Sequence, residues 1–200
     1  MAKQYNISAA KAAALFSKDK GIDKTALTNA ESKLGISFPK GLEELYLASG
    51  GFDIGAKSRV FAPSNITRLD GEDTAFIIGT SGDRLACLFS RDLLNDDPTV
   101  YLGNLAGRSL DFSVNQKLSD FLSWVVFEAV TEIRGEVVGV DDKGEIEELA
   151  KKLSFDLDKL TNGSADSCVI SLDDESGELV FVNTDGEGKI AVMVVIETKQ

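Results

Sequence analysis

The spacing of apolar residues predicts two short helices, joined by a tight link, in the N-terminal part of the chain. Leu27, Ala30 and Leu34 lie three and four residues apart, so they share one face of a helix. The same spacing returns over residues 42–46, after a link that contains two apolar residues and a proline. We expect both helices to bury these apolar faces in a common core.

Glycine and proline residues mark the ends of these two helices. Gly35 is expected to end the first helix, because glycine enters the left-handed conformation of a helix cap at little cost. Pro39 fits the first turn of the second helix, where its missing N–H leaves no hydrogen bond unmade. Gly50 and Gly51 follow a serine and break the second helix. We interpret all four residues as structural.

The segments before and after this helix pair have different patterns of apolar residues. Ser8 is expected to cap a first helix whose apolar residues are Ala12, Leu15 and Phe16. Thr25 is expected to cap the helix that follows. After Gly51, short apolar runs separated by turn residues predict strands. We place them at residues 52–54, 59–61, 74–79, 84–89 and 99–103. No helix of useful length fits between these runs, so the sheet should be mostly antiparallel. Helices followed by strands predict an α+β fold, with the sheet flanked by helices.

Residues 117–133 are expected to form a helix that is apolar on nearly every side. One face carries Leu118, Phe121, Leu122, Val125 and Ala129. Trp124 lies on another side, and we expect it to pack in the core. A helix with this pattern should be buried nearly all round.

The remaining segment predicts a second, smaller part of the structure. An acidic hinge is expected at residues 139–144, followed by a helix at 145–160. Strands are expected at 167–172, 178–182 and 189–197. The last strand is apolar on both faces, so it should be central in its sheet or covered on both sides. We therefore expect an α+β domain over residues 1–134. Residues 135–200 should form a helix and a three-stranded meander that pack on it.

The charge of the chain is strongly negative and unevenly distributed. The formal net charge is −12, and residues 141–200 contain fifteen acidic and six basic residues. Nucleic acids and anionic membranes are bound through basic surfaces, so neither is an expected partner. An acidic surface speeds the encounter with a basic protein, although it also serves simply to keep a protein soluble.

The residue types present restrict the chemistry that the chain can perform. It contains no histidine, which excludes Ser-His and Cys-His nucleophile pairs and removes the commonest metal ligand. Its two cysteines, Cys87 and Cys168, do not make a zinc-binding pattern or a disulfide framework. Cys87 lies among apolar residues and is interpreted as a small buried hydrophobe. We expect no metal, no cofactor and no catalytic residue, although two carboxylates in a cleft would suffice for a hydrolase.

The apolar runs and the N-terminal residues indicate where in the cell the protein is located. None approaches the roughly 20 residues that a membrane-spanning helix needs. The N-terminal residues lack the apolar core of a signal peptide. Together with the cysteine usage, this predicts a cytoplasmic protein.

The helix pair and the segments after it resemble a known family. The order of a helix, Leu-Gly, three residues and Pro39, a second helix and a Gly-Gly turn is similar to the signature of the SUKH superfamily, the Smi/Knr-like proteins. The resemblance continues through the Ile-Ile-Gly run at 77–79 and the strand at 99–103, and ends at the helix that contains Trp124. It covers roughly residues 14–133. Members commonly have Asn-Gly-Gly at the turn, where this chain has Ser49 before the two glycines.

The resemblance implies an α+β fold and a non-catalytic function. Most bacterial members are thought to be immunity proteins that bind and neutralise a toxin, often a nuclease. An acidic surface would then cover the basic substrate groove of the toxin. The candidate partner-binding residues are acids near the rim of the sheet: Asp53, Asp70, Glu72, Asp73, Asp83, Asp96 and Asp97. The alternative is a regulatory or scaffolding module that binds cellular proteins, as proposed for eukaryotic members.

Overall fold

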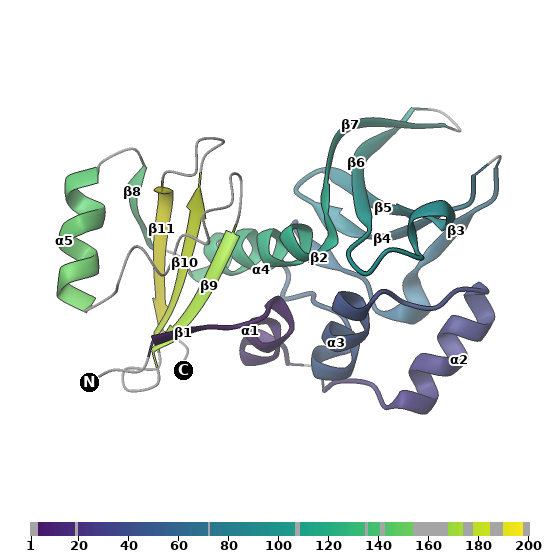
Figure 1. The fold of residues 1–200 in the computed structure, drawn as a ribbon, viewed down its shortest axis with the longest axis horizontal. Coiled ribbons are helices and arrows are strands. Elements are labelled where there is room, and N and C mark those ends of the chain that lie inside the picture. The colour runs from purple at the N-terminus through teal and green to yellow at the C-terminus, as the bar shows by residue number, and fades with distance from the viewer. Residues whose placement is uncertain are drawn as a thin grey trace. The chain divides into compact units, whose positions relative to one another are not determined.

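The computed structural model of the protein describes most of the chain. The described residues are 4–18, 20–71, 73–106, 109–134, 136–140, 143–153, 168–173, 178–184 and 190–197. Contacts within the chain divide it into two compact units, which Figure 1 shows as ribbons. One unit comprises Ala9–Ala129. The other comprises Met1–Ser8 together with Val130–Gln200.

The unit Ala9–Ala129 begins with three helices, α1 (Ala9–Phe16), α2 (Lys24–Leu34) and α3 (Lys40–Ser49). Figure 1 shows them gathered on one side of a six-stranded sheet. The predicted apolar faces are largely confirmed, because Leu27 and Leu34 are buried and Leu42, Leu45 and Tyr46 are fully buried. Ala12 and Phe16, two of the apolar residues named for the first helix, are buried, whereas the side chain of the third, Leu15, is 46% exposed.

The ends of the helices follow the glycines but differ from the prediction at two caps. Gly35 and Gly50 both have a φ of 71°, in the left-handed region, and each closes its helix as predicted. Pro39 is the residue before α3, one position earlier than expected. The cap of α2 is Asp23 and not Thr25, because the Asp23 carboxylate accepts the Ala26 N–H at 2.8 Å.

The sheet of this unit contains β2 (Arg59–Val60), β3 (Thr67–Leu69), β4 (Ala75–Ser81), β5 (Arg84–Phe89), β6 (Thr99–Ala106) and β7 (Ser109–Lys117). Its order is β2-β4-β5-β6-β7, and β3 also pairs with β4. Every described pairing in this sheet is antiparallel, which confirms the α+β prediction. Residues 52–54 do not form a strand, since only Phe52 bridges to Val60. The strands β3 and β7 were missed.

One face of the sheet carries the core of the unit. Phe76 on β4 pairs with Leu88 on β5, which in turn pairs with Val100 on β6. All three side chains are at most 2% exposed. The helix α4 (Leu118–Arg134) contributes the face predicted for residues 117–133, and its five members are buried. Trp124 is only half-buried, and its ring lies 5.2 Å from that of Phe127.

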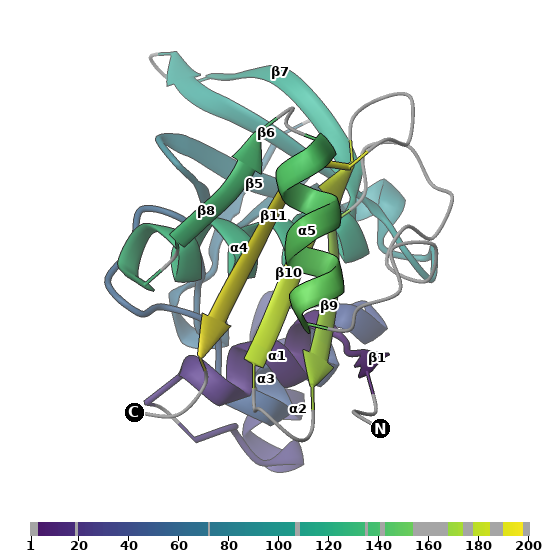
Figure 2. The same cartoon turned by 90° about the vertical axis from the view of Figure 1, so that its left-hand side faces the viewer.

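The second unit is built on a five-stranded sheet. Its strands are β1 (Gln4–Asn6), β8 (Glu136–Val140), β9 (Cys168–Asp173), β10 (Glu178–Thr184) and β11 (Ile190–Glu197), in the order β1-β9-β10-β11-β8. The predicted meander is confirmed as β9-β10-β11, and the predicted central position of the last strand is correct. Figure 2 shows α5 (Lys143–Leu153) lying across one face of this sheet.

The two edge strands of this second sheet, β1 and β8, were not predicted. The segment interpreted as an acidic hinge contains the end of β8, and α5 begins at Lys143, two residues earlier than expected. The predicted continuation of this helix to residue 160 lies outside the described residues. β1 was missed, because three residues of mixed polarity carry no strand signal. That the meander packs on the first domain remains a prediction.

Candidate functional site

A groove of about 320 Å³ lies between α2 and the short 3₁₀-helix η1 (Pro63–Asn65). Ala26, Asn29, Ala30 and Lys33 form its wall on α2, because positions three, four and seven apart share a helix face. The two alanines leave the groove open on this side, since a methyl group fills little of the space between α2 and η1.

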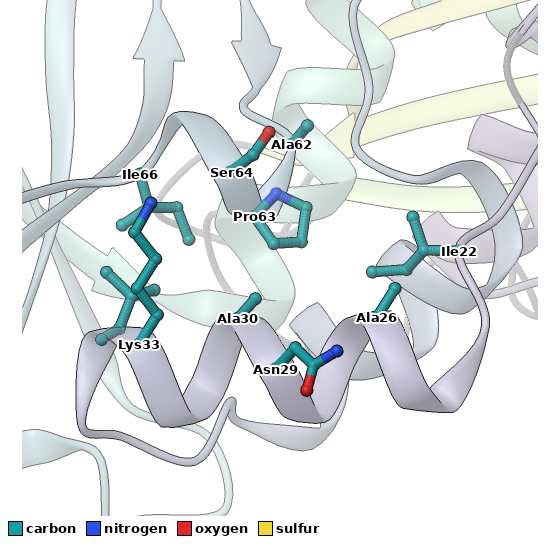
Figure 3. Close-up of a pocket in the computed structure, with 10 residues that line it drawn as sticks. Ile22, Ala26, Asn29, Ala30, Lys33, Ala62, Pro63, Ser64 and Ile66 are labelled. Carbon is teal, nitrogen blue, oxygen red and sulfur yellow. The ribbon is translucent and has the colours of Figure 1, made fainter.

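The opposite wall of the groove comes from the segment after β2. Pro63, Ser64 and Ile66 line it, and Pro63 and Ile66 are buried. Figure 3 shows Ala30 facing the ring of Pro63 across the groove, with Ala26 beside Ile22 at one end and Lys33 reaching toward Ile66 at the other. The groove can therefore hold an apolar group, with an ammonium group at its rim.

The predicted partner-binding acids lie at two opposite ends of the six-stranded sheet. Ser81 pairs with Arg84 and Arg59 pairs with Thr80, so Asp83 and Asp53 lie at one end. Ala75 pairs with Phe89 at the other end, where the connections to β4 and β6 place the second group. This group contains Asp70, Asp73, Asp96 and Asp97. Glu72 lies outside the described residues.

Four of these acids already have partners within the chain. Asp53 accepts a hydrogen bond from Gly55 N–H at 3.0 Å and pairs with Arg59 at 3.3 Å. Asp70 pairs with Arg68 at 2.8 Å, and Asp73 pairs with Arg91. Asp97 caps the start of α4, because its carboxylate accepts both the N–H and the hydroxyl of Ser119, at 2.9 and 2.7 Å. Asp53 and Asp70 are exposed, whereas Asp73 and Asp97 are half-buried, so these four acids stabilise the fold and only two of them are fully accessible to a partner.

The two other described acids are available to a partner. Asp83, at the tip of the β4–β5 hairpin, and Asp96, in the loop before β6, are both exposed. No hydrogen bond or ion pair holds either carboxylate among the residues that the structure describes. Gly82 and Asp83 form the two-residue connection between β4, which ends at Ser81, and β5, which begins at Arg84.

A buried polar cluster joins three segments of the same unit. Ser58 Oγ donates to Glu128 Oε2 at 2.6 Å, and Ser81 Oγ donates to the same oxygen at 2.8 Å. Ser58 Oγ also accepts the Gly82 N–H at 2.8 Å. No pattern in the sequence indicates this cluster, because the three side chains come from a loop, a strand and a helix. Ser58 is 2% exposed, so the cluster fastens the hairpin to α4 and does not present a nucleophile.

Cys87 is buried in the middle of β5, as predicted. Burial raises the pKa of its thiol to about 11, because an apolar environment disfavours the thiolate. The folded-state pKa is thus above the ordinary value of 9.0. The contribution of this thiol to the free energy of unfolding therefore has its full value below pH 9. It falls as the pH rises from 9 toward 11, because the unfolded chain loses the thiol proton first.

We expect Cys87 to resist alkylation in the folded protein. In a Cys168→Ala variant, iodoacetamide at pH 8 should modify Cys87 more slowly than in the unfolded chain, by a factor of about 100 or more, because only the thiolate reacts. Mass spectrometry of timed samples, with and without guanidinium chloride, measures both rates. Equal rates would show that β5 opens freely.

Neither a cluster of metal ligands nor a membrane-crossing helix is found among the described residues. No three acidic or cysteine side chains among the described residues come together closely enough to hold a metal ion. No described helix has both the length and the apolar character needed to cross a bilayer.

Comparisons of the chain with protein-family models, curated proteins and solved structures give no match.

Proposed function

We propose that the chain is a cytoplasmic, non-catalytic binding protein of the SUKH type that neutralises a toxin by covering its active surface. The observation that carries this proposal is the helix–link–helix unit closed by Gly50 and Gly51, which resembles the family signature and leads into an antiparallel sheet. The exposed carboxylates of Asp83 and Asp96 support it, because neither is held by another group among the described residues.

The mechanism is occlusion assisted by charge. A nuclease toxin needs a basic groove for its substrate, and an acidic protein competes for that groove. With a net charge of −12, the chain would also accelerate the encounter with such a toxin, and this acceleration weakens as salt is added. Asp53, Asp70, Asp73 and Asp97 contribute to this field while they hold their own loops in place.

The test is protection by co-expression. The chain is expressed together with the toxin-like products of neighbouring genes, and growth is measured. Rescue by this chain, and not by an unrelated acidic protein, is the expected result. In a purified pair, the double variant Asp83→Lys/Asp96→Lys should lower the association rate constant by about tenfold at low salt.

A single-charge control is Asp53→Asn, because Asp53 is exposed but paired with Arg59. It should leave the association rate within about twofold of the wild type. If none of the proteins encoded by neighbouring genes binds the chain, the proposal that it neutralises a toxin is wrong. Stable binding of a cellular protein without any rescue of growth would identify a regulatory or scaffolding module instead.

A further inference from the structure

We infer that the groove between α2 and η1 is a second binding site, which takes an extended peptide segment of another protein. The peptide carries an aliphatic side chain followed, within two residues, by a carboxylate. This inference does not depend on the toxin proposal, because it concerns a different surface and the opposite charge. Four features of the groove lead to it: its shape, its apolar floor, its charge and its polar rim.

The dimensions of the groove fit a short stretch of extended chain. From Ala26 to Lys33 the wall on α2 spans seven residues, or about 10 Å at the helical rise of 1.5 Å per residue. An extended peptide advances about 3.3 Å per residue, so about three of its residues cover this length. A side chain inserted between the two alanines would then be followed by a residue that reaches Lys33.

The floor of the groove is apolar. Leu34 and Ile66 are each 8% exposed, and Pro63 faces Ala30 across the space. An aliphatic side chain that fills the gap would remove these apolar surfaces, together with its own, from water.

The charge of the groove is positive although the protein is acidic. Lys33 is the sole charged residue among its described lining, and no ion pair of Lys33 is found in the described part of the chain. Two acids in neighbouring segments have partners of their own. The Glu31 carboxylate accepts the Phe38 N–H at 2.7 Å, and Asp70 pairs with Arg68. A carboxylate on the occupant is therefore the complement of this end of the groove.

The polar rim favours a peptide over a simple alkyl chain. Asn29 offers both an amide N–H and a carbonyl oxygen on the α2 side. Ser64, on the η1 side, donates its hydroxyl hydrogen to Asn65 at 3.2 Å and so keeps its lone pairs as acceptors. These groups match the N–H and C=O groups of a peptide backbone, which an alkyl chain does not have.

The experiment measures the anisotropy of a fluorescein-labelled tetrapeptide, Leu-Ser-Leu-Glu with an amidated C-terminus, on the full chain. We expect saturable binding at concentrations below about 1 mM, with at least about tenfold weaker binding of the same peptide ending in glutamine. Lys33→Glu should weaken binding of the first peptide by at least about tenfold, and a peptide ending in lysine should prefer this variant.

Two further variants separate the groove from general charge and folding effects. Lys24→Glu makes the same charge change on an exposed residue of α2 outside the groove, and should change the affinity by less than about twofold. Ala30→Leu fills the groove and should abolish binding while the circular dichroism spectrum is unchanged. The inference is overturned if the glutamine peptide binds equally, if Lys24→Glu acts like Lys33→Glu, or if decanoate binds the groove and the peptide does not.

Discussion

Replacing Gly51 by alanine is expected to destabilise the unit Ala9–Ala129 by about 3 kcal/mol. Gly51 has a φ of 135°, a backbone conformation that residues with a side chain rarely adopt. A Cβ atom there would also lie 2.9 Å from the backbone nitrogen of Ala62 and 3.1 Å from the carbonyl oxygen of Val60. Strain and steric overlap therefore act together, and the backbone that leads from α3 to β2 has to shift. Chemical denaturation followed by circular dichroism measures the loss.

The control for this change is Gly82→Asn. Gly82 also has a positive φ, 55°, but nothing lies within 4 Å of a Cβ added there. Asparagine tolerates this left-handed region, so the free energy of unfolding should change by less than about 1 kcal/mol. A loss from Gly51→Ala as small as that from Gly82→Asn would mean that the turn after α3 adapts easily, and its structural interpretation would be wrong.

Replacing Glu128 by alanine is expected to cost about 2–3 kcal/mol of stability. The carboxylate accepts hydrogen bonds from Ser58 and Ser81, and both serines are buried. Its removal leaves two buried hydroxyl groups without their acceptor and separates the β4–β5 hairpin from α4. Glu128→Gln keeps one acceptor oxygen without the charge and should lose about half as much.

The control for this second change is Asp83→Asn, in the turn beside Ser81. Asp83 is exposed, so the free energy of unfolding of the Asp83→Asn variant should stay within about 0.5 kcal/mol of the wild type. A double-mutant cycle of Glu128→Ala with Ser58→Ala then isolates the shared hydrogen bond. Additive losses from the two substitutions would show that the two side chains do not stabilise each other.

The sequence predicted those features that follow from local physical rules. The helix ends at Gly35 and Gly50 were correct, because the left-handed cap is a property of glycine itself. The strand at 84–89 was predicted at its true bounds, because Leu85, Cys87 and Leu88 form a dense apolar run between turn residues. The central position of β11 also followed from its two apolar faces.

What the sequence did not reveal depends on contacts between distant segments. β7 was missed although Leu110, Phe112 and Val114 alternate with polar residues, which is the pattern of a half-buried strand. Its last three residues are all polar, and they belong to the strand through pairing with β6. The Ser58–Glu128–Ser81 cluster joins residues up to 70 positions apart. The groove depends on η1 lying opposite α2, and the small residues Ala26 and Ala30 were its one visible trace in the sequence. Asp53 was placed in a predicted strand at 52–54 that the structure does not contain. The ion pairs of the predicted acids with Arg59, Arg68 and Arg91 could not be foreseen.

The pairing of β1 with β9 has a consequence for the order in which the protein is assembled. Gln4 lies opposite Asp173, so the two partners are separated by 169 positions of the chain. A ribosome delivers β1 first and its partner strand only after all of Ala9–Ala129 has been made. Closing so long a loop costs less entropy once the intervening residues are compact. The middle unit should therefore fold first, and β1 should join its sheet as a late step.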